Sequence, residues 1–385
     1  MLVTYNAPNR AHHYAYATAL ARAGCLRAFV SAFSRFSPRA ALPEVGDRLI
    51  RVDHIQNFYL ASMRLRVPVV VSDELAYWSK LWMDYRSEKA ARESDIFLFY
   101  NGAGLRTSER LRATPVARVV EVVNSHVLVQ ERIMREEHGL LGLPFRPFHR
   151  REVARRVKEY ETADAILCPS GFVKRSFIEQ GIPAERILTV PYGFALQPDA
   201  GERQPSNDVF RVLYVGLISI RKGLRYLLEA FRKLKHPHKE LWIVGPTTKG
   251  SGLDGVALPE GVRFLGVLKG EELANAYRSC QVFVLPTVED GFGLVLGEAL
   301  SFGLPVIATS NSGGSDLFEE GKEGFVVPIR DPQAITERLQ SLADDSGLLA
   351  AMSSAANARA KSLGGWDASG KLLVESLATV SKSGQ

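Results

Sequence analysis

The sequence predicts an α/β protein made of two doubly wound domains, each with a parallel sheet covered by helices. Its 385 residues suffice for two domains of ordinary size. Short apolar runs alternate with longer helical patterns along the chain, and several runs are apolar on both faces, as buried parallel strands are. The segment 196–208 interrupts this alternation because it is rich in Pro and polar residues, which is typical of an interdomain linker.

Residues 1–195 are expected to form an N-terminal domain. Ser170 is placed to cap its last helix and Gly181 to end it. The expected strands are Arg27–Ala32, Val67–Ser72, Ile96–Tyr100, Val116–Val123, Ala165–Pro169 and Ile187–Pro191. The expected helices are His12–Ala23, Ser87–Glu93 and Gly171–Gln180.

Residues 209–364 repeat the alternation and are expected to form a C-terminal domain. Its strands are predicted at Arg211–Val215, Glu240–Val244, Val282–Pro286 and Pro305–Thr309. Its helices are predicted at Gly223–Leu234, Glu271–Arg278, Gly293–Phe302 and Pro332–Leu342. After a break at Gly364 and Gly365, residues 365–385 predict one more helix, which is a candidate to cross back to the N-terminal domain.

The net charge of +6 is unevenly distributed. Residues 1–195 hold 28 basic and 20 acidic side chains, whereas the remainder hold 20 and 22. A basic half suits an anionic ligand, a membrane surface or nucleic acid. The arginine-rich stretch Arg146–Lys158 is a candidate peripheral membrane contact, with a solvated basic face as the alternative. Nucleic acid is disfavoured because no reading motif accompanies the basic residues.

The chain is expected to be cytoplasmic, with the inner face of the membrane as an alternative location. No apolar run reaches the ~18 residues that span a bilayer. The N-terminus has no pattern of a signal peptide, and the three cysteines are far apart.

The first passage that indicates chemistry is Leu285–Thr309, where a strand, a glycine-containing loop and a helix follow one another. A helix that begins near Gly293 presents free backbone N–H groups and a positive dipole end, which suit an anion. Glu298 lies in this helix among apolar residues, so a ligand hydroxyl pair is a fitting partner for its carboxylate. The alternative is an ordinary exposed helix glutamate.

The second passage is Val215–Gly223, which also follows a strand and opens a helix. It holds adjacent Arg221 and Lys222 at the carboxyl end of a predicted strand, where ligands bind in doubly wound sheets. Two cations there suit a diphosphate. The alternative is a pair of solvated residues at a helix start.

Together these passages resemble the retaining glycosyltransferases of the GT-B fold, specifically family four (glycosyltransferase group 1), which uses nucleotide-sugar donors. The resemblance covers about residues 120–345 and includes further matching segments at Glu161–Ser170, Val190–Gly193, Arg263–Gly266, Gly313–Gly314 and Gly324. It implies two domains facing across a cleft, with the donor on the C-terminal domain and the acceptor entering from the N-terminal domain.

The family's pair of acids falls on Asp290 and Glu298. The resemblance implies that Glu298 binds the donor ribose and that Asp290 faces the donor sugar, although Asp290 is one methylene shorter than the usual glutamate. The family lysine is Lys222. The arginine that often follows the strand glycine, Gly216, is replaced by a leucine, so Arg221 is the candidate substitute.

Other residues carried over from the resemblance are backbone contacts and one histidine. Gly293 and Leu294 would give N–H groups to the donor phosphate, and Gly245 and Leu268 would hold the base. Gly216 is a further candidate donor-binding residue. His126 is the candidate near the reacting sugar, with a packed or helix-capping histidine as the alternative.

No metal ligand or cofactor is expected, since no Asp-x-Asp occurs and the donor, a UDP- or GDP-sugar, is a substrate. His12 and His13 could be metal ligands, but no carboxylate has a telling spacing from them, so we interpret them as a solvated helix start. Two alternative functions stay open: a nucleotide-sugar-binding regulatory protein without turnover, and a GT-B sugar phosphorylase.

Overall fold

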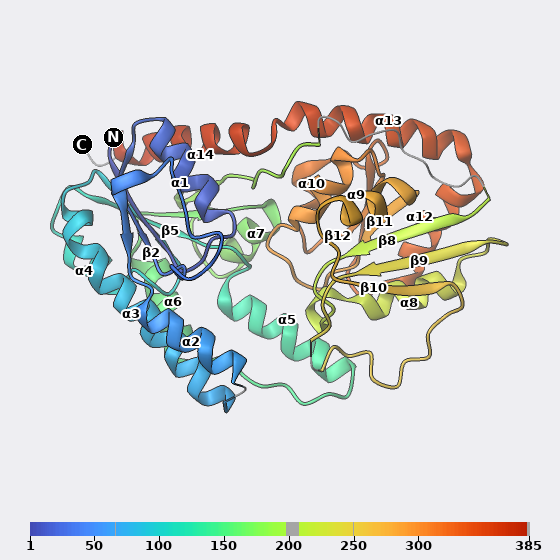
Figure 1. Cartoon of the computed structure of the whole chain (residues 1–385), viewed down its shortest axis with the longest axis horizontal. Coiled ribbons are helices and arrows are strands. Elements are labelled where there is room, and N and C mark those ends of the chain that lie inside the picture. Colours follow the sequence, from blue (N-terminus) through green and yellow to red (C-terminus); the bar gives the residue numbers. More distant parts are fainter. Residues whose placement is uncertain (66, 198–207, 249, 383–385) are drawn as a thin grey trace.

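The structure, a computed structural model, describes residues 1–65, 67–197, 208–248 and 250–382. The predicted linker 196–208 falls mostly on residues 198–207, which lie outside the described residues. The chain forms two α/β lobes side by side, with the N-terminal lobe on the left of Figure 1 and the C-terminal lobe on the right.

The N-terminal domain has a seven-stranded sheet with the order β3-β2-β1-β4-β5-β6-β7, and every neighbouring pair is parallel. The inner strands are buried on both faces, which explains their continuous apolar sequence. The strands are β1 (Val3–Ala7), β2 (Leu26–Ser31), β3 (Leu49–Arg51), β4 (Ile96–Tyr100), β5 (Ala117–Glu121), β6 (Ala165–Cys168) and β7 (Ile187–Thr189).

Seven α-helices accompany this sheet within the described ranges. The predicted cap at Ser170 is confirmed, because its Oγ accepts a hydrogen bond from the N–H of Val173 at 3.2 Å. The helices are α1 (His13–Arg22), α2 (His54–Arg64), α3 (Val69–Arg92), α4 (Leu105–Leu111), α5 (Val127–Leu140), α6 (Arg150–Thr162) and α7 (Gly171–Glu179). Two short 3-10 turns lie at Gly46–Arg48 and Ala184–Arg186.

The predicted strand Val67–Ser72 is wrong, because this segment leads into helix α3. Pro68 lies directly before the first turn of the helix, where a missing N–H costs nothing. Val69, Val70 and Val71 are exposed, so their β-branched side chains do not fill a sheet interior. The long helical pattern that follows them decides the local structure over β propensity.

The C-terminal domain has a six-stranded parallel sheet with the order β10-β9-β8-β11-β12-β13. The strand order reverses between β8 and β11, so the sheet is doubly wound and its ligand crevice is expected there. The predicted fold class is confirmed. The strands are β8 (Phe210–Val215), β9 (Lys239–Val244), β10 (Val262–Gly266), β11 (Val282–Leu285), β12 (Val306–Thr309) and β13 (Gly324–Val327).

The helices of this half include a short 3-10 turn, η3, that carries the two adjacent cations. They are η3 (Ile220–Lys222), α8 (Leu224–Lys233), α9 (Gly270–Ser279), α10 (Leu294–Ser301), α11 (Gly314–Leu317), α12 (Pro332–Asp344), α13 (Ser346–Leu363) and α14 (Gly365–Lys382).

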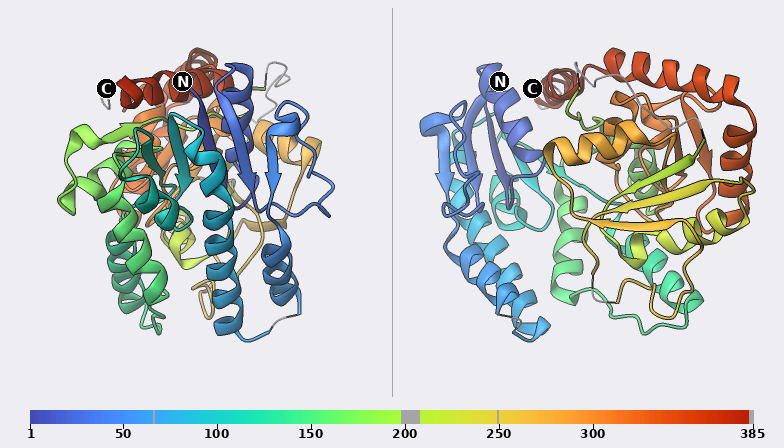
Figure 2. Two further views of the ribbon diagram at one scale, coloured as in Figure 1. Left: turned by 90° about the vertical axis from the view of Figure 1, so that its left-hand side faces the viewer. Right: turned by 45° about the vertical axis from the view of Figure 1, so that its right-hand side comes forward.

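The last helix lies on the other domain. Helix α13 runs along the C-terminal domain, and α14 continues over the N-terminal domain beside α1 (Figures 1 and 2). Ser369 Oγ donates a hydrogen bond to the backbone oxygen of Pro191 at 2.7 Å. The domain boundaries themselves stay a prediction.

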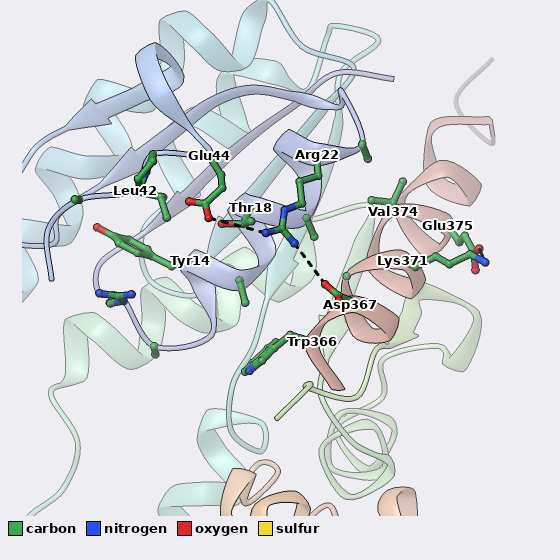
Figure 3. Close-up of a pocket in the computed structure, with 18 residues that line it drawn as sticks. Tyr14, Thr18, Arg22, Leu42, Glu44, Trp366, Asp367, Lys371, Val374 and Glu375 are labelled. Carbon is green, nitrogen blue, oxygen red and sulfur yellow. Dashed lines mark hydrogen bonds and ion pairs between the residues drawn. The ribbon is translucent and has the colours of Figure 1, made fainter. Parts of the chain in front are cut away.

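Helices α1 and α14 border a cavity of about 790 Å³ (Figure 3). Arg22 lies at its rim and approaches Asp367 of α14 at 3.5 Å. None of the site residues expected from the sequence lines this cavity. We therefore assign it to the docking of α14.

The docking of α14 predicts an unusual effect for a helix glycine. Alanine normally stabilises a helix by up to ~1 kcal/mol relative to glycine. A Cβ at Gly370, however, would lie 2.5 Å from the Cβ of Ala19 in α1. We expect Gly370→Ala to lower the free energy of unfolding by about 1–3 kcal/mol. Gly139→Ala in α5 is the matched control, because nothing lies within 4 Å of the added methyl group. Denaturant unfolding of both variants tests this, and equal stabilisation of both would contradict it.

Candidate active site

The carboxyl ends of β8 and β9 meet at two glycines that the sequence identified separately. Gly245 has φ +140°, and a Cβ there would lie 1.9 Å from the backbone oxygen of Gly216. Only glycine permits this approach. Leu268 follows β10 and is half-buried. The three residues expected near the donor therefore follow three adjacent strands.

The residue that follows the turn η3, Gly223, is in close contact with the backbone at the end of β11. Gly223 has φ +64°, and a Cβ on it would lie 2.0 Å from the backbone oxygen of Pro286. The backbone oxygen of Arg221 accepts a hydrogen bond from the N–H of Val288 at 2.9 Å. These contacts, between residues 63 and 67 positions apart in the sequence, join the two motifs into one site.

The two cations are paired with two acids of the loop after β11. Lys222 Nζ forms an ion pair with Asp290 Oδ2. Arg221 Nη1 donates to Oε2 and to the backbone oxygen of Glu289, at 3.1 and 3.0 Å. Burial opposes the charge on Asp290, but Lys222 and Arg221 outweigh it and hold its pKa below the ordinary value. Burial likewise opposes the charge on Arg221, while Asp290 and Glu289 raise its pKa. Asp290 and Arg221 are therefore charged near neutral pH.

Helix α10 offers its N-terminus beside these charges. Gly293 precedes the helix with φ +82°, and no side chain of the described residues caps it. Leu294, the first helical residue, is half-buried. The backbone N–H groups of the first turn and the positive end of the helix dipole are suited to an anion.

Glu298 is a half-buried carboxylate on the same helix. Tyr277 donates its hydroxyl to Glu298 Oε2 at 3.2 Å, and the Tyr277 ring stacks on Phe302 with centroids 4.9 Å apart. Burial raises the pKa of Glu298, and the hydrogen bond from Tyr277 offsets part of this. Within the described ranges, Tyr277 is the one hydrogen-bond donor to this carboxylate, so Oε1 is left for a ligand hydroxyl.

His126 lies in the N-terminal domain, where it caps α5. Its Nδ1 accepts a hydrogen bond from the N–H of Leu128 at 3.3 Å. The buried ring packs against Tyr160 and Phe177, with centroids 4.8 and 5.0 Å away. Burial lowers the pKa of His126 to about 4, so the ring is neutral. This environment fits the packed, capping alternative, and a role near the reacting sugar stays a prediction.

The loop after β11 also contacts the N-terminal domain. A Cβ on Gly291 would lie 1.8 Å from the backbone oxygen of Val123, just after β5. Ser170 Oγ donates to the backbone oxygen of Gly291 at 2.6 Å. Glu289 accepts hydrogen bonds from Ser125 and Gln130. Sequence patterns assigned no role to Glu289, because its partners in the N-terminal domain lie about 160 residues away.

A cavity of about 440 Å³ lies next to this contact and is lined by α3, α5, α6 and the segment before α6. Asn124 and Gln130 form its side toward the C-terminal domain. Deeper in it, Glu152 pairs with both Lys80 and Arg156. One carboxylate facing two cations leaves a local excess of positive charge.

His12 and His13 are not solvated, which corrects the expectation from the sequence. Both are buried and contact Glu121 at the end of β5, with His12 Nε2 2.6 Å from Glu121 Oε1. Tyr5 donates its hydroxyl to the other carboxylate oxygen at 2.6 Å. Burial lowers the pKa of His12 to about 4. Glu121 lies 109 residues from His12 in sequence, so spacing gave no signal of this cluster.

Most cations of the arginine-rich stretch are engaged in ion pairs. Arg155 is buried against Asp84, and Arg151 pairs with Glu74. A membrane contact through Arg146–Lys158 stays a prediction. Among the residues that the structure describes, no helix combines the length and the apolar character needed to cross a bilayer.

Comparison with known protein families and sequences agrees with the resemblance. Residues 209–345 match the model of the family described as Glycosyl transferases group 1. The D-inositol 3-phosphate glycosyltransferase of Streptomyces scabiei is 36% identical over 184 residues, 44% of this chain and 41% of that protein. The sulfoquinovosyl transferase of Arabidopsis thaliana is 31% identical over 206 residues, 48% and 39% of the two chains. The chain spans about two fifths of the length of these curated relatives.

Comparison with solved structures confirms the GT-B fold. Sucrose-phosphate synthase from Thermosynechococcus elongatus has a TM-score of 0.71 and 18% identity over 100% of both chains. HepE from Anabaena, solved in complex with UDP-glucose, has a TM-score of 0.64 and 15% identity over 98% of this chain and 100% of that chain. At these identities the likeness concerns the fold alone.

The contact of Gly291 with Val123 predicts a variant that holds the cleft open. The methyl group of Gly291→Ala would meet backbone rather than a flexible side chain, so the two domains must separate. We expect a larger radius of gyration in small-angle X-ray scattering, with Gly139→Ala as the unchanged control. An unaltered radius for Gly291→Ala would show that the loop yields without opening the cleft.

Proposed function

We propose that this chain, whose residues 209–345 match the model of the glycosyltransferase group 1 family, transfers a sugar from a nucleoside-diphosphate sugar to an acceptor. The transfer retains the anomeric configuration and needs no metal ion. The observation that carries the proposal is the junction between the Arg221–Lys222 turn and the loop after β11, which leads into the uncapped N-terminus of α10.

At this junction, Lys222 and Arg221 supply positive charge. The diphosphate of the donor gains negative charge there as its bond to the sugar breaks. Lys222 has three N–H donors and Arg221 has five. Within the described residues, their hydrogen bonds to Asp290 and Glu289 use only part of these donors. The remaining donors and the N–H groups of α10 stabilise the diphosphate as the sugar becomes oxocarbenium-like. Closure of the cleft excludes water and limits hydrolysis of the donor.

The donor is proposed to lie across the C-terminal domain. Glu298 binds the ribose hydroxyls, and Gly216, Gly245 and Leu268 surround the base. Asp290 faces the sugar from its ion pair with Lys222. A UDP-sugar is the first donor to test, because HepE, which shares the fold, was solved with UDP-glucose. A GDP-sugar is the second.

The acceptor is proposed to enter the cavity between α3, α5 and α6. Lys80 and Arg156 share one carboxylate, Glu152, so an anionic group on the acceptor balances the excess charge. The name of the Streptomyces relative, a D-inositol 3-phosphate glycosyltransferase, supports a phosphorylated polyol as the first acceptor class.

The test is a product analysis with a panel of donors and acceptors. Purified protein is incubated with UDP- and GDP-sugars and with polyols in phosphorylated and unphosphorylated form, with and without inorganic phosphate and EDTA. We expect transfer to the phosphorylated polyol, retained configuration by NMR, and turnover that survives EDTA. Donor binding without transfer would favour a regulatory protein, and sugar phosphate formed only with inorganic phosphate would favour a phosphorylase.

Glu298→Gln is expected to weaken donor binding without unfolding the protein. Losing a charged acceptor for ligand hydroxyls costs about 1.5–3 kcal/mol, which is a roughly 10- to 150-fold rise in Kd. Calorimetry with UDP measures this. The matched control is Glu229→Gln, which replaces a half-buried glutamate on α8 that pairs with Lys233. Equal affinities for the two variants would remove Glu298 from the site.

A further inference from the structure

The carboxylate of Glu289 connects the two domains. Its side chain is 0% exposed. Oε1 accepts hydrogen bonds from the backbone N–H and the hydroxyl of Ser125, at 3.1 and 2.9 Å. Oε2 accepts from Gln130 Nε2 at 3.0 Å and from Arg221 Nη1 at 3.1 Å. Ser125 and Gln130 belong to the N-terminal domain and Arg221 to the C-terminal domain, so four donors from both sides meet on one carboxylate.

This arrangement depends on closure of the cleft. A buried carboxylate is costly unless hydrogen bonds or a cation compensate it. If the domains separate, Ser125 and Gln130 withdraw and water must replace them. Gln130 and Arg221 both donate a hydrogen bond to Oε2 of Glu289. The hydrogen bond from Gln130 therefore fixes the carboxylate, and the position of the carboxylate determines where Arg221 lies.

Arg221 keeps donors for a ligand in this state. Its side chain is 31% exposed, and its hydrogen bonds within the described part of the chain run through Nη1 alone. Nε–H and Nη2–H are left for another acceptor. Holding Nη1 fixes the plane of the guanidinium, which sets the direction of these remaining donors.

A second buried carboxylate joins the domains away from this turn. Glu137 of α5 is buried and accepts hydrogen bonds from the hydroxyl of Tyr226 at 2.9 Å and from Arg330 Nε at 2.7 Å. Glu137 also helps to hold the two domains together, but within the described residues it has no hydrogen bond to Arg221. Glu137 is therefore a matched comparison for Glu289.

We propose that Glu289 is a positioning residue that couples closure of the cleft to the orientation of Arg221. The inference rests on the proposed role of Arg221 at the donor diphosphate and extends it to the N-terminal domain. When the cleft closes, Ser125 and Gln130 fix the carboxylate, and the carboxylate fixes the guanidinium before the sugar bond breaks. The effect belongs to the transition state, so it changes kcat more than donor affinity.

A double-mutant cycle tests the coupling. Glu289→Gln keeps the size of the side chain but loses the charge that orients Arg221. We expect kcat to fall about tenfold, with the KM of the donor changed much less. In an Arg221→Ala background, the same substitution should have almost no further effect on kcat. Glu137→Gln, whose carboxylate bonds Tyr226 and Arg330 and not Arg221, should still lower kcat in the Arg221→Ala background.

Gln130→Ala provides a variant that leaves Glu289 and Arg221 intact. It removes one donor from the N-terminal side and should show the same dependence on Arg221. If Glu289→Gln and Gln130→Ala lower kcat equally with and without Arg221, the two residues act only as structural contacts and the proposal is overturned.

Small-angle X-ray scattering with and without UDP measures closure of the cleft and does not require turnover. It therefore tests this inference separately from the proposed function. We expect a larger radius of gyration for Glu289→Gln, Gln130→Ala and Glu137→Gln than for the wild type. An unchanged radius for the first two overturns the coupling even if the wild type is active. A wild type that is inactive with every donor overturns the proposed function instead.

Discussion

The loop from Thr287 to Gly293 is the constraint on which the rest of the site depends. Three neighbours hold it: the backbone oxygen of Arg221 accepts from Val288, that of Asn311 accepts from Asp290, and Gly291 contacts the end of β5 in the other domain. Each contact is made through backbone atoms, so it tolerates little displacement. The loop thereby fixes the acids, the start of α10 and the separation of the two domains together.

Charge balance explains how such a site remains stable without a ligand. Lys222 and Arg221 are paired with Asp290 and Glu289, so no buried charge is left uncompensated in this cluster. The cations still have unused donors, and the dipole of α10 adds positive potential. An anion can therefore bind without first displacing either acid. The cavity between α3, α5 and α6 differs, since Glu152 balances only one of the two cations, Lys80 and Arg156, that contact it.

Local sequence patterns predicted most of the fold, because each strand and helix depends largely on neighbouring residues. Strands β2, β4–β9, β11 and β12 lie at predicted apolar runs, and Ser170 caps α7 as expected, whereas β1, β3, β10 and β13 were not predicted. Local patterns gave the wrong prediction in two segments, one exposed and one buried. Val69–Val71 have the composition of a strand but lie exposed on α3. His12 and His13 have the composition of a solvated helix start but are buried against Glu121.

The sequence by itself determined the two parallel-sheet domains and the two motifs that carry Lys222, Arg221, Asp290 and Glu298, because these follow strand ends that local patterns identify. Only the tertiary structure decided which charges pair, that His126 is packed between aromatic rings, and that Glu289 joins the domains. The physical reason is distance along the chain. Hydrogen bonds act over about 3 Å, and the fold brings together Gln130, Arg221 and Glu289 from positions far apart in the sequence.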